Sequence, residues 1–224
     1  MKLLSVIAIT LVASLPAVAQ NQLGIFAGPQ ATSTRYTVNG KLQDNTMKYG
    51  FQAGATLKVP FENKLFFAPA AYYSMKGYKV KFTDFAFPPD ANAADNNTTI
   101  HCFELAALLQ YDFGNNPSHF YFKGGPSLDF QLVGKEKYNL RTGGSVSRTM
   151  TWSPGAYGRY SANFIAQLGY ETNSGFIIFA QYSHGATSIN NADLGPRIRH
   201  RVFGLSIGKY LKKNKIIIDT RNRE

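Results

Sequence analysis

Cysteine and tryptophan occur once each in this sequence of 224 residues, and acidic residues are few, with 13 Asp and Glu against 24 Lys and Arg. The single cysteine, Cys102, excludes an intramolecular disulfide. After the N-terminal segment there is no run of about 18 apolar residues, which excludes a protein that crosses a membrane with helices. Two classes remain: a soluble secreted protein, and a protein that crosses an outer membrane with strands.

Residues 1–19 have the features of a secretory signal peptide. A basic Lys2 precedes an apolar stretch and the small-residue pattern Ala17-Val18-Ala19. The apolar stretch is too short for a membrane anchor. We therefore predict cleavage after Ala19, a folded domain over residues 20–211, and a basic periplasmic tail over residues 212–224.

Aromatic residues and glycine are abundant, with 17 Phe, 13 Tyr and 20 Gly, and this composition favours strands and tight turns. Eight segments alternate between apolar and polar residues: 22–34, 49–60, 65–81, 100–113, 119–132, 159–170, 176–187 and 199–211. Short polar connections alternate with longer ones, as in outer-membrane barrels. The pattern predicts an all-β fold, an eight-stranded antiparallel up-and-down transmembrane β-barrel with short periplasmic turns and long extracellular loops.

The stretch "FELAALLQYDF" shows which face of such a strand meets lipid. Phe103, Leu105 and Leu109 share one face, and Glu104 and Gln110 share the other. Aromatic residues gather at the segment ends and the polar faces carry small and charged residues, so we expect the apolar faces to point outward. The first, third and seventh segments alternate less regularly, and a bulge could shift their register.

The polar faces contain charges of both signs, and these form the candidate site. Buried charges must pair and form hydrogen bonds, because an isolated one is costly. We interpret the set as a salt-bridged plug that closes the barrel; the functional alternative is an ion or proton path. Near the short turns we place Lys58, Asp112, Lys123 and Glu171, and nearer the long loops Lys76, Glu104 and Asp129.

No catalytic, metal or cofactor motif is present, so we predict a non-enzymatic protein without a cofactor. The adjacent Ser183 and His184 would face opposite sides of a strand, and no G-x-S-x-G motif occurs. A role in the aromatic girdle or in hydrogen bonding at the rim is favoured for this pair. Cys102 is interpreted as a small interior filler. None of the histidines has a metal-ligand spacing: His101, His119, His184 and His200.

Basic residues gather in two of the predicted long loops, and arginine and lysine there are suited to lipopolysaccharide phosphates. We expect outer-membrane lipids and lipopolysaccharide as partners, the barrel-assembly machinery during biogenesis, no nucleic acid, and a monomer. The residues are Lys135, Lys137, Arg141 and Arg148 in the third loop and Arg197, Arg199 and Arg201 in the fourth.

Several short motifs give the chain a family resemblance over about residues 22–211. They are "GIFAGPQAT", "GFQAGATLKVPF", "FFAPAAYYSMKGYKVKF", "FKGGPSLDF", "NFIAQLGYE" and "AQYSHGATSIN". In this order they resemble the PorT-like outer-membrane β-barrel proteins of Bacteroidota, and the resemblance implies an eight-stranded barrel.

The function that we predict is a structural or interaction role with a closed interior. The family name suggests, as an alternative, an accessory component of protein secretion. Two further alternatives are a rim-active lipid-modifying enzyme and a soluble periplasmic barrel that binds an apolar ligand.

Overall fold

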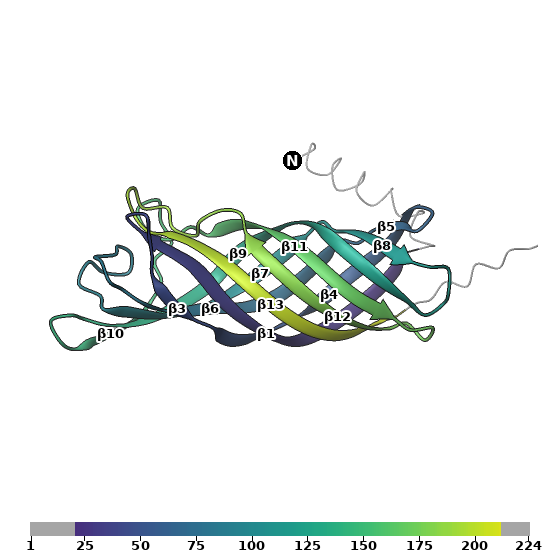
Figure 1. Cartoon of the computed structure of the whole chain (residues 1–224), viewed down its shortest axis with the longest axis horizontal. Coiled ribbons are helices and arrows are strands. Elements are labelled where there is room, and N and C mark those ends of the chain that lie inside the picture. The colour runs from purple at the N-terminus through teal and green to yellow at the C-terminus, as the bar shows by residue number, and fades with distance from the viewer. Residues whose placement is uncertain (1–20, 212–224) are drawn as a thin grey trace, which may run out of the picture.

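The computed structural model describes residues 21–211, and the signal peptide predicted over 1–19 and the tail predicted over 212–224 lie outside them. All regular elements among these residues are strands (Figure 1). No helix in this part of the chain is long and apolar enough to cross a membrane. The strands are β1 (Gln22–Val38), β2 (Lys41–Leu42), β3 (Asp44–Thr46), β4 (Lys48–Glu62), β5 (Leu65–Phe67), β6 (Ala70–Lys81), β7 (Asp95–Ala106), β8 (Leu109–Phe113), β9 (His119–Asn139), β10 (Ser145–Thr149), β11 (Tyr160–Glu171), β12 (Phe176–Gly185) and β13 (Arg197–Tyr210).

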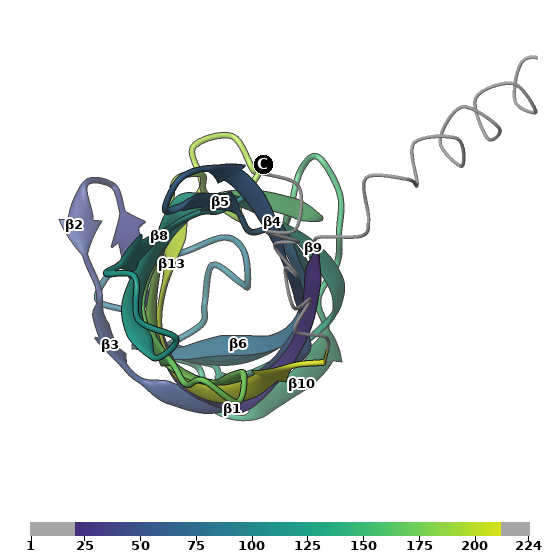
Figure 2. The same ribbon diagram turned by 90° about the vertical axis from the view of Figure 1, so that its right-hand side faces the viewer.

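These elements form one closed antiparallel wall. β5 and β6 together make one strand of the wall and β7 and β8 another, while the short strands β2, β3 and β10 extend the sheet at the long-loop end. β13 pairs with β1 from Gly24↔Tyr210 to Thr37↔Arg197, which closes the ring. Figure 2 shows this ring from the end that carries β5 and β8. The predicted eight-stranded up-and-down barrel is confirmed.

The wall continues through the two places where a strand is interrupted. β5 and β6 are separated at Ala68 and Pro69, because a proline has no N–H to donate to the ladder. Instead the Ala68 N–H donates to the Leu108 carbonyl oxygen at 2.7 Å, and Pro69 accepts a hydrogen bond from the Leu57 N–H at 2.9 Å. No backbone edge is therefore left open at this point of the wall.

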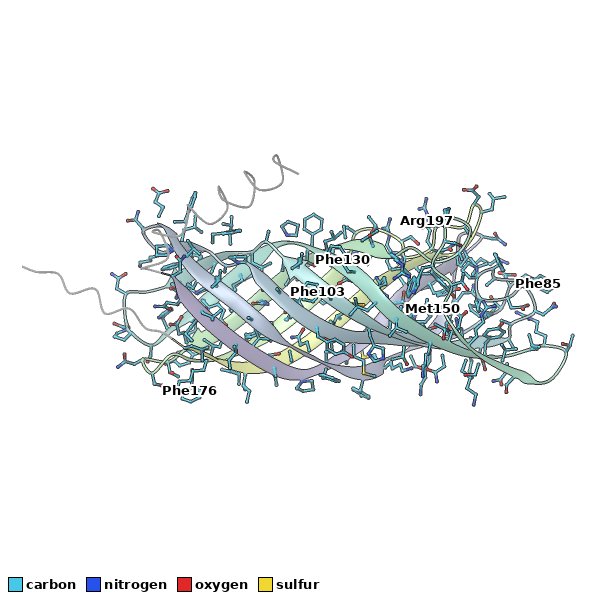
Figure 3. All side chains as sticks on the ribbon, turned by 180° about the vertical axis from the view of Figure 1, so that it is seen from behind. Phe85, Phe103, Phe130, Met150, Phe176 and Arg197 are labelled. Carbon is cyan, nitrogen blue, oxygen red and sulfur yellow. The ribbon has the colours of Figure 1, made fainter. Side chains whose placement is uncertain are left out.

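Side-chain directions follow the predicted alternation. Leu105 is 42% exposed on the outer wall, whereas its neighbour Glu104 is fully buried. Figure 3 shows Phe103 and Phe130 on the outside of the wall. The result confirms the inverted arrangement, with apolar side chains outside and polar ones inside.

β1 and β12, whose patterns are irregular in the sequence, alternate without a bulge. Their apolar residues face both ways, because Phe26, Ile177 and Phe179 point inward into an apolar cluster of the interior. In the third predicted segment a register shift does occur, where β5 pairs with β4, and a further shift lies between β7 and β9 at His101/Cys102.

The predicted connection over residues 133–158 is partly wrong, since much of it is strand. β9 runs on to Asn139 and forms a hairpin with β10 (Ser145–Thr149). β1 and β7 also extend beyond the predicted segments at this end. The apolar alternation stops where the outer face of the strands becomes polar, while the backbone hydrogen bonds continue, so the sequence pattern underestimates the strand lengths.

The opposite end of the barrel has short turns. Gly114 and Gly175 have φ angles of 100° and 82°, a left-handed conformation that glycine adopts without strain. The Leu211 N–H donates to the Leu23 carbonyl oxygen at 2.7 Å, so the two ends of the described chain meet here.

Candidate functional site

Three charged residues meet inside the barrel near the short turns. The Lys58 ammonium lies 2.7 Å from Asp112 Oδ2 and 2.8 Å from Glu171 Oε2. Gln110 donates a hydrogen bond of 2.6 Å to the other oxygen of Asp112. We call Lys58, Asp112, Glu171 and the neighbouring His119 the short-turn cluster. Each comes from the end of a different strand, β4, β8, β11 and β9, so only the closed barrel brings them together.

His119 is the member that sequence reasoning missed. Its Nε2 lies 3.0 Å from Asp112 Oδ2 and 3.6 Å from Glu171 Oε2, and its Nδ1 is 3.1 Å from the Asn116 carbonyl oxygen. Asp112, His119 and Glu171 each offer a ligand atom, all within 4.8 Å of one another. The Lys58 ammonium already contacts both carboxylates, so it holds the position that a metal cation would take. The predicted absence of a metal site stays a prediction.

A second group, which we call the central cluster, consists of Lys76, Glu104 and Asp129. Lys76 Nζ is 2.8 Å from Glu104 Oε2 and 2.8 Å from both oxygens of Asp129. Ser127 donates to the free oxygen of Glu104 at 2.6 Å, and Ser161 donates to Asp129 at 3.2 Å. All three charged side chains are buried, so a single buried ammonium is shared between two buried carboxylates.

Lys123, the last of the predicted interior residues, lies opposite Gln110 in the β8–β9 register, next to the short-turn cluster but outside its ion pairs. It is buried and takes part in none of the ion pairs found among residues 21–211. Its Nζ lies 3.5 Å from Tyr210 Oη and 5.1 Å from the centre of the Tyr121 ring, within cation–π range. The structure therefore brings six of the seven predicted residues into two clusters and leaves Lys123 against aromatic rings.

Uncharged polar side chains and two apolar clusters fill the remaining interior. One cluster contains Phe26, Ala68, Ala70, Tyr72, Ala106, Leu108, Tyr121, Ile165, Ile177, Phe179 and Tyr210. A second cluster joins strand residues to residues of the long connections and fills the long-loop end: Tyr36, Val38, Tyr78, Val80, Phe82, Ala86, Ala93, Ile100, Cys102, Tyr138, Met150, Tyr157, Ile189 and Ile198. Charged and apolar groups together occupy the lumen along its length.

Two arginines that the sequence placed on a basic rim instead hold the loops over the barrel mouth. Arg141 donates to the Phe82 carbonyl oxygen at 3.0 Å, and Arg148 donates to the Pro89 carbonyl oxygen at 2.6 Å. Arg148 also forms an ion pair with the buried Glu136 at 2.7 Å. These contacts tie residues 82–89 to the β9–β10 hairpin, so both guanidinium groups have a structural role.

Glu136 is held from its other side by Tyr157. The Tyr157 hydroxyl donates to Glu136 Oε2 at 2.8 Å. Burial raises the pKa of Tyr157 well above its ordinary value, and the nearby Tyr78, Tyr36 and Glu136 raise it further. The phenol therefore stays protonated and remains a donor at any physiological pH.

Ser183 and His184 do not meet, as expected from their position on one strand. Ser183 points into the barrel and is buried, whereas His184 points outward, with its Nδ1 3.2 Å from the Tyr182 hydroxyl. A nucleophile and base cannot pair across the wall between them.

We expect Cys102 to be unreactive in the folded barrel. Its side chain is fully buried and its Sγ donates to Gln131 Oε1 at 2.9 Å. A maleimide added to the protein in detergent should label Cys102 only after unfolding in urea, as followed by mass spectrometry. Complete labelling of the folded protein within minutes would contradict the packing of this part of the lumen.

Comparison with known proteins places the chain among barrel proteins. Residues 18–191 match the family described as "Outer membrane protein beta-barrel domain". No curated protein gives a match.

Solved structures with a similar shape have low sequence identity. Ail, the attachment invasion locus protein of Yersinia pestis, is 15% identical, with 85% of this chain and 98% of Ail covered and a TM-score of 0.44. OprG from Pseudomonas aeruginosa is 12% identical, with 86% and 97% covered and a TM-score of 0.44. Neisserial surface protein A is 12% identical, with 84% and 96% covered and a TM-score of 0.43.

Proposed function

The chain belongs to the outer membrane protein beta-barrel domain family, and from this premise we propose that it is a closed barrel with a structural or interaction role and no catalytic activity. It is a small outer-membrane β-barrel protein. The observation that carries the proposal is the filled interior, in which Lys58 and Lys76 each pair with two buried carboxylates. An eight-stranded barrel has an interior that side chains can just fill.

The proposed orientation places the short-turn end, with both ends of the described chain, in the periplasm. Short periplasmic turns and longer extracellular loops are the usual arrangement of such barrels. The proposed signal peptide over residues 1–19 would deliver the chain to the periplasm, where the barrel-assembly machinery would insert it. Residues 212–224 would then form a periplasmic tail, and we propose that the barrel is a monomer.

We also propose contact with lipopolysaccharide at the extracellular end. Lys79, Lys81, Lys135 and Lys137 are exposed on β6 and β9 in the part of the wall that lies beyond the apolar band. Ammonium groups at this level would face the phosphates of the outer leaflet.

The closed interior predicts an electrically silent barrel. Wild-type protein reconstituted into a planar bilayer should give no stable conductance steps, because charged and apolar side chains fill the lumen. A porin of known conductance in the same bilayer is the positive control. Steady, porin-sized steps from the purified wild-type protein would overturn the closed-barrel proposal and favour the ion path.

A second candidate function is that of an accessory component of protein secretion. This candidate rests on the resemblance to the PorT-like barrels. Crosslinking in cells followed by purification of the barrel would identify such a partner. The lipid-modifying enzyme is disfavoured, because Ser183 and His184 lie on opposite sides of the wall. A soluble barrel for an apolar ligand does not agree with an outer surface that exposes so many aromatic and aliphatic side chains.

A further inference from the structure

Four arginines gather on the outer face where β1 and β13 pair. Arg197, Arg199 and Arg201 occupy alternate positions of β13, and their intervening neighbours point into the barrel. Arg35 of β1 is directly opposite Arg199 in the antiparallel register. We call these four residues the arginine row. Its members share one face of two adjacent strands, so their guanidinium groups lie on the same side of the wall.

Within the described part of the chain, the arginine row has no acidic partner. None of the ion pairs among residues 21–211 includes any of its four members. The Nε atoms of Arg199 and Arg201 are also buried without a hydrogen-bond acceptor. Like charges directly opposite each other on a sheet are destabilising, and a buried donor without an acceptor is costly. Residues 21–211 by themselves therefore leave this group unsatisfied, and an anion would satisfy it.

Lys48, a basic residue at the same end of the barrel, has hydrogen-bond partners within the chain. Lys48 Nζ lies 2.7 Å from Asn97 Oδ1 and 2.5 Å from Thr99 Oγ1.

The position of the arginine row fits the headgroup region of the outer leaflet. Phe203 and Tyr182 form an aromatic pair on the outer wall, with ring centres 4.7 Å apart. Arg201 is two residues beyond Phe203 on β13, or about 7 Å along the strand. Arg197 lies at the long-loop end of the wall (Figure 3). The guanidinium groups thus follow directly after an aromatic girdle, at the depth where outer-leaflet phosphates lie.

We propose that the arginine row binds a phosphate group of lipid A, the membrane anchor of lipopolysaccharide. The planar guanidinium fork matches phosphate oxygens in two parallel hydrogen bonds, which a lysine cannot form. The site lies on the outer wall beside lipid-exposed aromatic residues, so a phosphate carried by a lipid reaches it from the membrane. The inference rests on the proposed extracellular position of the long loops, and it assigns lipopolysaccharide contact to one site.

The test uses the purified barrel in dodecyl maltoside and native mass spectrometry with added lipid A. The wild-type protein should retain lipid A, and the double variant Arg199→Gln/Arg201→Gln should lose about tenfold or more in affinity. The matched control, Lys64→Gln/Lys209→Gln, removes the same charge from the short-turn end of the barrel, far from the proposed lipopolysaccharide contact, and should bind like the wild type. Heat-modifiable mobility on gels checks that each variant is folded.

Lipid A without phosphate groups should bind the wild type as weakly as phosphorylated lipid A binds the arginine variant. Equal retention by the arginine variant and the wild type, or an equal loss in the lysine control, would overturn the proposal. Displacement of lipid A by millimolar inorganic phosphate would also overturn it, because the site would then be one for a free anion. A conducting barrel would contradict the proposed closed interior but would leave this binding measurement intact.

Discussion

Replacing Lys76 with methionine should lower the free energy of unfolding by about 3–5 kcal/mol. Methionine has a similar length but no charge, so Glu104 and Asp129 would lose the only ammonium that contacts them among the described residues. Both carboxylates are fully buried and would repel each other. The measurement is a urea titration of the reconstituted barrel, with the folded fraction determined from its electrophoretic mobility.

Two controls separate the effect of losing the ion pairs of Lys76 from the effect of losing any lysine side chain. Lys137→Met removes an exposed lysine of β9 and should leave the unfolding midpoint almost unchanged. Glu104→Gln should cost less than Lys76→Met, because Lys76 keeps both of its contacts with Asp129. Equal midpoints for Lys76→Met and Lys137→Met would show that the central cluster does not contribute to stability.

Leu105→Arg should destabilise the barrel by about 2–4 kcal/mol if the residue lies near the midplane of the membrane. Leu105 is exposed on the outer wall of β7, so the new charge would have to enter the hydrocarbon. The same titration in lipid vesicles measures the effect.

Leu42→Arg provides the matched control. Leu42 is 62% exposed, but it lies in the short β2 strand beyond the end of the wall, where an arginine remains in water. The same substitution should therefore be tolerated there. If both variants unfolded at the same urea concentration, the outer face of β7 would not be in contact with lipid.

The sequence predicts most side-chain directions well, because successive residues of a regular strand point to opposite faces. The alternation therefore predicts that Glu104, Lys58 and Asp129 face the interior, and the structure buries all three. Where the interior itself is apolar, as at Phe26 and Phe179, the alternation of apolar and polar residues weakens. The sequence then still locates the strand, but it does not predict which of its faces points inward. The ends of β9 and β10 were missed for a related reason, since a strand with two polar faces has no alternation to detect.

The partners across the lumen were decided only by the closed barrel. Glu171 and Lys58 are 113 residues apart in the chain, and only the closure of the wall brings them within 2.8 Å. His119 joins them because β9 begins next to the same short turns, a fact that no local spacing expresses. The direction of a side chain is a local property of the strand and can be predicted from the sequence. The choice of its partner depends on the tilt and stagger of eight strands, which only the tertiary structure fixes.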